Sequence, residues 1–72
     1  MDMRRLVGEN VRRFRLAANL TQEQLAERAG FTQQYVSELE NGKQNPTAVT
    51  LFELAQQLGC EPADLVSRPK SP

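Results

Sequence analysis

The chain has 72 residues, 39% of them hydrophobic and 6% aromatic, which predicts one small domain around a compact, largely aliphatic core. It has no histidine and a single cysteine, which excludes an intrachain disulfide and the Ser-His and Cys-His pairs of nucleophilic enzymes. We therefore expect no catalysis, cofactor, metal site or small-molecule ligand. Nine basic residues balance nine acidic ones, so the formal net charge is zero. No apolar run approaches the ~18 residues of a membrane span, and we therefore expect a cytoplasmic protein without a membrane partner.

The first 20 residues predict a basic amphipathic helix over residues 2–18. Val7, Val11 and Phe14 recur at helical intervals and form one inward stripe, while arginines occupy the other faces. Asn19 suits the left-handed position after the helix. Residues 1–20 hold five arginines against two acidic residues, and residues 21–42 hold four glutamates against one arginine. The first helix is therefore either a phosphate-facing edge or simply a solvated face.

Residues 21–42 predict two short helices separated by a tight turn. Thr21 followed by Gln24 is a capping box at the start of the first of them, and Gly30 suits its end. Thr32 caps the next helix, which Asn41-Gly42 ends. We expect inward-facing side chains at Leu25, Ala26, Ala29, Val36 and Leu39. A connection of only three residues forces a steep crossing, so this stretch predicts a helix-turn-helix.

The remaining sequence predicts two more helices. Thr47 caps a helix that runs to about Leu58, with Leu51, Leu54, Ala55 and Leu58 on its core face and Gly59 at its end. A short helix over residues 62–66 follows, with a proline early in it. We expect an all-α fold of five helices in one domain over residues 1–67, and a disordered tail over residues 68–72.

The second helix of the helix-turn-helix begins with polar residues that suit contact with DNA bases. A glutamine amide presents a donor beside an acceptor, matching N6 and N7 of adenine in the major groove, so Gln33 and Gln34 are base-reading candidates. Tyr35 and Ser37 suit thymine methyl groups or phosphates, and Glu38 can accept from N4 of cytosine. The alternative is that these are ordinary helix residues: exposed glutamines, a part-buried tyrosine and a solvated glutamate.

A second set of polar residues suits the DNA backbone. Gln22 lies at a helix start, where free amides and the helix dipole favour a phosphate, and its side chain can bind that phosphate or support Gln33. Asn41, Lys43 and Asn45 follow the third helix and can contact a further phosphate, which sets register but reads no sequence. Polar residues are also common in such loops for turn formation alone.

The segments VRRFRLAANLTQEQLAERAG, TQQYVSELENGKQNP and LFELAQQLG resemble the XRE/Cro-type helix-turn-helix family, which includes lambdoid phage repressors. The resemblance covers roughly residues 6–66, and LTQEQLA together with SELENG is specific for it. It implies DNA contacts at Gln22, Gln33, Gln34 and Asn41, and a backbone contact at Lys43. It also implies a largely buried ion pair between Arg15 and Glu40, which would remove Arg15 from the DNA-facing charge.

The expected function is that of a sequence-specific regulator of transcription, a repressor, that binds double-stranded DNA. Because the chain is neutral overall, we expect weak binding by one copy and a homodimer, at least on DNA, at a two-fold-related operator. Phe52 and Val66 are candidates for the dimer contact, or they complete the core. The alternatives are an antitoxin or a restriction-modification controller of the same fold, or a protein-interaction module that lost DNA binding.

Overall fold

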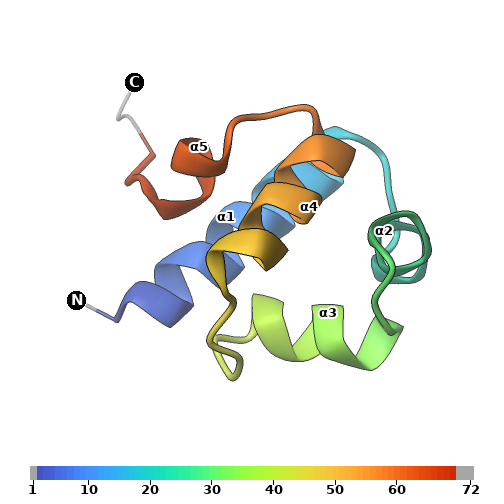
Figure 1. Cartoon of the computed structure of the whole chain (residues 1–72), viewed down its shortest axis with the longest axis horizontal. Coiled ribbons are helices and arrows are strands. Elements are labelled where there is room, and N and C mark those ends of the chain that lie inside the picture. Colours follow the sequence, from blue (N-terminus) through green and yellow to red (C-terminus); the bar gives the residue numbers. More distant parts are fainter. Residues whose placement is uncertain (1, 70–72) are drawn as a thin grey trace.

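The computed structural model describes residues 2–69 and contains five helices over that range, with no strand. They are α1 (Met3–Ala17), α2 (Gln22–Ala29), α3 (Gln33–Glu40), α4 (Ala48–Leu58) and α5 (Pro62–Val66), as Figure 1 shows. The all-α, five-helix fold is therefore confirmed. Residues 70–72 of the expected tail lie outside the described residues. None of the described helices is long and apolar enough to cross a membrane.

The helix ends follow from hydrogen bonds between residues close in sequence. The Thr21 hydroxyl accepts from the Gln24 amide at 3.0 Å, and the Gln24 side chain accepts from the Thr21 amide at 2.9 Å, which is the expected capping box. Gly30 ends α2 at a φ of 81°, where a side chain would be strained. The first helix begins one residue later than expected, because the Asp2 carboxylate accepts from the Arg4 amide and makes Asp2 the N-cap.

The core lies where α1, α2, α3, α4 and α5 converge. Six aliphatic residues are fully shielded from solvent: Val11, Leu25, Val36, Leu39, Leu54 and Leu65. Phe14, Ala29 and Leu51, expected to face inward, are only partly buried and pack against the edge of this cluster. The core thus draws on every helix, and α3 packs against both α1 and α2.

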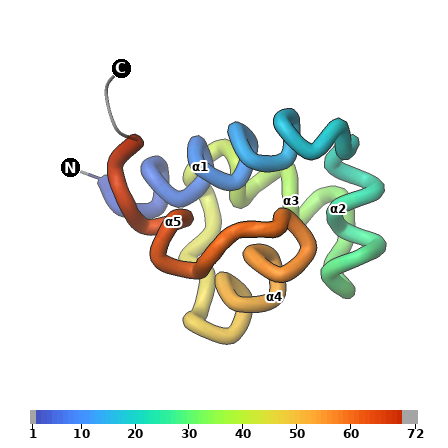
Figure 2. Tube along the Cα trace, turned by 90° about the horizontal axis from the view of Figure 1, so that it is seen from above, coloured from blue at the N-terminus to red at the C-terminus, as the bar shows by residue number. Residues whose placement is uncertain are grey.

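Two buried residues of α1 were not expected to carry structure. A Cβ atom on Gly8 would lie 2.3 Å from the carbonyl oxygen of Leu39, so only glycine lets α1 approach the end of α3 this closely. The Asn10 amide donates to the carbonyl oxygens of Leu65 and Ser67 at 2.9 and 2.8 Å. Figure 2 shows the result: α5 lies beside the first half of α1. Together these two residues place α1 against both α3 and α5.

Candidate nucleic-acid interface

The crossing of α2 and α3 turns one side of α3 outward. Ala26 of α2 and Val36 and Leu39 of α3 are buried between the helices, and the Phe31 amide donates to the Ala26 carbonyl at 2.8 Å to close the turn. In Figure 1, α2 is seen nearly end-on with α3 running away from it across the base of the molecule. This is the helix-turn-helix arrangement that residues 21–42 predict.

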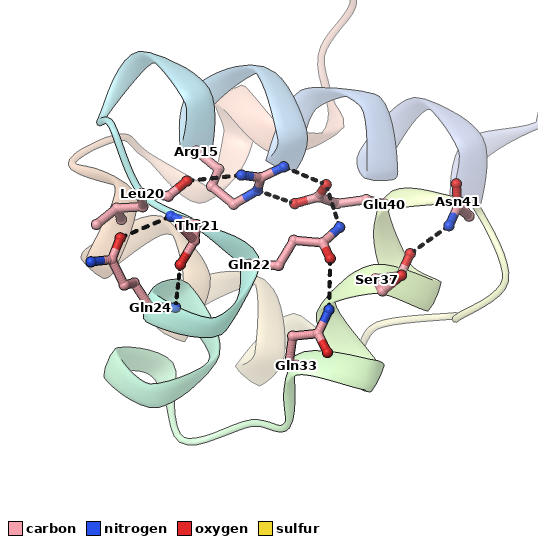
Figure 3. Close-up of polar contacts among 9 residues, drawn as sticks. All are labelled: Arg15, Leu20, Thr21, Gln22, Gln24, Gln33, Ser37, Glu40 and Asn41. Carbon is pink, nitrogen blue, oxygen red and sulfur yellow. Dashed lines mark hydrogen bonds and ion pairs between the residues drawn. The ribbon is translucent and has the colours of Figure 1, made fainter.

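The outward side of α3 carries short polar side chains in a row. Gln33, Gln34 and Asn41 are exposed and Ser37 is half-buried. Because four residues make about one helical turn, Gln33, Ser37 and Asn41 lie above one another along α3. Figure 3 shows these three side chains spaced along the helix from its start to its end. The row therefore places amide and hydroxyl groups along the outward side of α3.

The ion pair expected between Arg15 and Glu40 is present and buried. Nε of Arg15 lies 2.6 Å from Oε2 of Glu40, Nη2 lies 3.0 Å from Oε1, and the two side chains are 9% and 3% exposed. Arg15 also donates through Nη1 to the Leu20 carbonyl at 2.8 Å. The pair joins the end of α1 to the end of α3, and its bidentate geometry satisfies both charges inside the protein.

Gln22 connects this ion pair to the exposed row. Its Nε2 donates to Oε1 of Glu40 at 3.1 Å, and its Oε1 accepts from Nε2 of Gln33 at 3.0 Å. Of the two roles considered for Gln22, the side chain is placed to support Gln33. Its backbone still lies in the first turn of α2, where amides are free to meet a phosphate.

Tyr35 and Glu38 have partners within the protein. The centroids of the Tyr35 and Phe31 rings lie 5.0 Å apart, and the Tyr35 ring packs against the core. The ring of Tyr35 therefore contributes to the packing of the fold. Oε1 of Glu38 accepts from the Gln44 side chain at 2.8 Å, which ties α3 to the following loop. Base contact by Tyr35 would therefore use its hydroxyl group, and base contact by Glu38 would use its other carboxylate oxygen.

The other polar residues expected to contact phosphate lie at the C-terminal end of α3 and in the loop that follows it. Nδ2 of Asn41 donates to the Ser37 carbonyl at 2.9 Å, and Lys43 and Asn45 are exposed in the loop that follows. A groove beside Asn41 is also lined by Arg5, Glu9, Arg12 and Glu40. Arg12 is exposed and, among the described residues, has no ion pair or hydrogen bond, whereas Arg5 pairs with Glu9. The sequence alone does not single out Arg12 among the five arginines of α1, because periodicity does not show which face of α1 adjoins α3.

Comparison with known proteins gives a consistent result. A family model described as helix-turn-helix matches residues 11–65. The chain is 55% identical over 67 residues to an uncharacterized HTH-type transcriptional regulator of Sinorhizobium fredii, covering 93% of this chain and 87% of that protein. It is 40% identical over 68 residues to control protein C.SmaI of Serratia marcescens, covering 94% and 81% of the two chains. The crystal structure of the restriction-modification controller protein C.AhdI from Aeromonas hydrophila superposes with a TM-score of 0.82 at 35% identity, covering 86% of this chain and 94% of that chain.

Proposed function

This chain belongs to the XRE-type helix-turn-helix family and is a DNA-binding transcriptional regulator, and we propose that it represses transcription by occupying an operator through α3. The observation that supports this best is the exposed row of amide and hydroxyl groups on α3, held outward by a buried crossing with α2. A protruding helix of this kind enters the major groove, where base edges present donors and acceptors. A protein that binds an operator must share a compartment with the DNA. The cytoplasmic location that the sequence predicts is consistent with this requirement.

In this proposal Gln33 and Gln34 read bases directly. Both side chains are exposed in the first turn of α3, the part of a recognition helix that reaches base edges. Ser37 continues the row one turn later, and Tyr35 and Glu38 contribute through their free hydroxyl and carboxylate atoms. Each of the two glutamines offers the donor and acceptor that match adenine.

The DNA backbone is contacted on both sides of that row. The start of α2 at Gln22 offers free amides to one phosphate, and Asn41, Lys43 and Asn45 at the other end of α3 contact the next. Arg12 adds a positive charge beside Asn41. Contacts of this kind hold α3 in register and make affinity depend on salt.

We further propose that two copies bind together at a two-fold-related site. The chain carries no net charge, so one copy gains little from general attraction to DNA. Phe52 and Val66 are 50% and 38% exposed and lie on α4 and α5, two helices that contact each other. Contact through them would set two copies of α3 against half-sites about one helical turn apart.

A second candidate function is control of a restriction-modification system. Two of the similar proteins, control protein C.SmaI and the restriction-modification controller C.AhdI, match this chain over most of their length. This version predicts that the selected DNA site lies in front of restriction and modification genes in the source genome. If the site occurs only next to unrelated genes, control of a restriction-modification system is ruled out and repression at an operator is retained.

Selection of bound sequences from a random duplex library tests the proposal directly. We expect a two-fold-related consensus, and we expect Gln33→Ala and Gln34→Ala each to relax preference at a defined base pair by about 1–3 kcal/mol. Gln56→Ala is the matched control, because Gln56 is an exposed glutamine on α4, away from α3. If the unchanged protein enriches no sequence even at low salt, the proposal is wrong.

A further inference from the structure

A continuous hydrogen-bonded relay runs from the buried ion pair to the surface of α3. In order it comprises Arg15, Glu40, Gln22 and Gln33, and Figure 3 shows the four side chains joined end to end. Each of the three links is between 2.6 and 3.1 Å. The relay therefore connects a buried ion pair to a side chain proposed to read a base.

The direction of every hydrogen bond in the relay follows from Glu40. A carboxylate paired with a guanidinium is an acceptor only, so the group of Gln22 that faces Glu40 must be its Nε2. The opposite orientation of that amide would place two oxygen acceptors 3.1 Å apart. With Nε2 held by Glu40, Oε1 of Gln22 faces Gln33 and can only accept. Gln33 must in turn present Nε2.

This direction decides which atoms of Gln33 remain for DNA. One N–H of its amide is used in the bond to Gln22, which leaves the second N–H and Oε1 free. The free N–H can donate to N7 of adenine, and Oε1 can accept from N6 of the same base. Because each group is fixed on one side, this match occurs in only one orientation of the base. A glutamine without this support rotates about its terminal bond and exchanges the two positions.

We propose that Glu40 is a positioning residue for sequence recognition, which acts through Gln22 to fix the donor and acceptor sides of the Gln33 amide. The ion pair then has a role beyond stability, because it determines how sharply one base pair is discriminated. This inference rests on the proposed function, since it assigns a cause to the base preference of Gln33. It predicts that substitutions at Glu40 and Gln22, which themselves read no base, change the sequence preference only at the base pair that Gln33 reads.

The test uses the ratio of affinities for the preferred duplex and for a duplex changed only at the base pair that Gln33→Ala relaxes. Partial unfolding lowers the affinity for every duplex by the same factor, so the ratio is unaffected by a purely structural defect. The same holds for loss of a phosphate contact at Gln22, which weakens binding uniformly. A change in the ratio therefore reports a change in base reading, and the ratio at the Gln34 base pair separates positioning of Gln33 from movement of α3 as a whole.

Gln22→Leu and Glu40→Gln interrupt the relay at two different links. Leucine keeps the bulk of Gln22 without its amide, and glutamine at 40 keeps the shape of the carboxylate but accepts or donates equally well. A good bidentate contact discriminates by roughly 5- to 150-fold. We expect each variant to lower the ratio at the Gln33 base pair by about 5-fold or more, and to leave the ratio at the Gln34 base pair unchanged.

A double-mutant cycle completes the experiment. In a Gln33→Ala background, neither Gln22→Leu nor Glu40→Gln should change the ratio further, because the side chain through which they act is gone. An unchanged ratio in the single variants would overturn the relay while leaving the proposed function standing. Equal loss of discrimination at the Gln34 base pair would also overturn it, since Glu40 would then act on α3 as a whole. If the unchanged protein selects no sequence, both the relay and the proposed function fail.

Discussion

At the scale of single residues, burial separates ion pairs that matter from those that do not. Arg5 and Glu9 pair at 3.3 Å on the surface, with side chains 78% and 64% exposed, and such pairs contribute between about 0 and 1 kcal/mol. Arg15 and Glu40 pair in the interior, where loss of one partner leaves the other charge without solvent or counter-ion. The same interaction type therefore has different consequences in the two places.

We predict that Glu40→Ala lowers the free energy of unfolding by about 3–5 kcal/mol, because it leaves the Arg15 guanidinium unpaired in the interior. The measurement is urea denaturation followed by circular dichroism. Glu27→Ala is the control: Glu27 is exposed and, among the described residues, has no ion pair or hydrogen bond, so its loss should change stability by less than about 0.5 kcal/mol. Equal midpoints for the two variants would show that the pair carries no stability.

Cys60 is predicted to react slowly with alkylating reagents at neutral pH. Partial burial raises the pKa of its thiol, and the nearby carboxylates of Asp64 and Glu61 raise that pKa further. Because the thiolate is the nucleophile, a raised pKa means a smaller reactive fraction at any pH below it. Iodoacetamide labelling at pH 8 should be slower in the folded protein than in urea. A faster rate in the folded protein would contradict this prediction.

At the scale of elements, the position of α3 depends on close approach by α1. Gly8 allows the backbones of the two helices to meet where the Leu39 and Glu40 carbonyls end α3. Asn10, two residues further along the chain, holds α5 against α1 by donating to two carbonyl oxygens. Contacts on its buried side thus place α3, and its exposed side takes no part in that packing.

We predict that Gly8→Ala destabilises the domain by about 1–3 kcal/mol, although alanine is the better helix former by about 1 kcal/mol. The added methyl group would sit 2.3 Å from the Leu39 carbonyl oxygen, so α1 must move away from α3. Thermal unfolding measures the change. Gly30→Asn is the comparison, because an added Cβ there would meet no atom within 4 Å beyond the adjoining residues, and asparagine tolerates positive φ. A larger loss at Gly30 would contradict the packing argument.

At the scale of the whole molecule, the distribution of charge and apolar surface matters more than the totals. Five arginines lie on α1, but Arg15 is neutralised by Glu40, and Arg4 and Arg5 have carboxylate partners. Little net positive charge therefore remains to attract DNA. The exposed apolar residues on α4 and α5 are the feature that would let two copies combine weak contacts into one site.

We predict that Phe52→Ser weakens association between copies and lowers affinity for a two-fold-related duplex, while the monomer stays folded. Phe52 is 50% exposed, so its removal costs the core little. Leu16→Ser is the matched control, since Leu16 is 54% exposed but lies on α1. Sedimentation equilibrium without DNA should distinguish the two variants. A monomer at every concentration of the unchanged protein, with and without DNA, would remove the dimer from the proposal.

The sequence by itself determined the local structure and the family. Thr21, Thr32 and Thr47 each cap the helix expected of them, and Gly30, Gly42 and Gly59 all take positive φ. These features depend on hydrogen bonds and backbone preferences within about four residues, so the pattern of residue types is enough to predict them. The polar start of α3 could be identified in the same way, because periodicity shows which side of a helix is not buried.

The tertiary structure alone decided what joins these elements. Asn10 reaches Leu65 across 55 residues, and Arg15 reaches Glu40 across 25, a pair that only the family resemblance implied. The need for glycine at position 8 and the relay from Glu40 to Gln33 have no local signature either. Contacts of this kind arise when helices distant in sequence pack together, so their partners and the direction of their hydrogen bonds exist only in the folded chain.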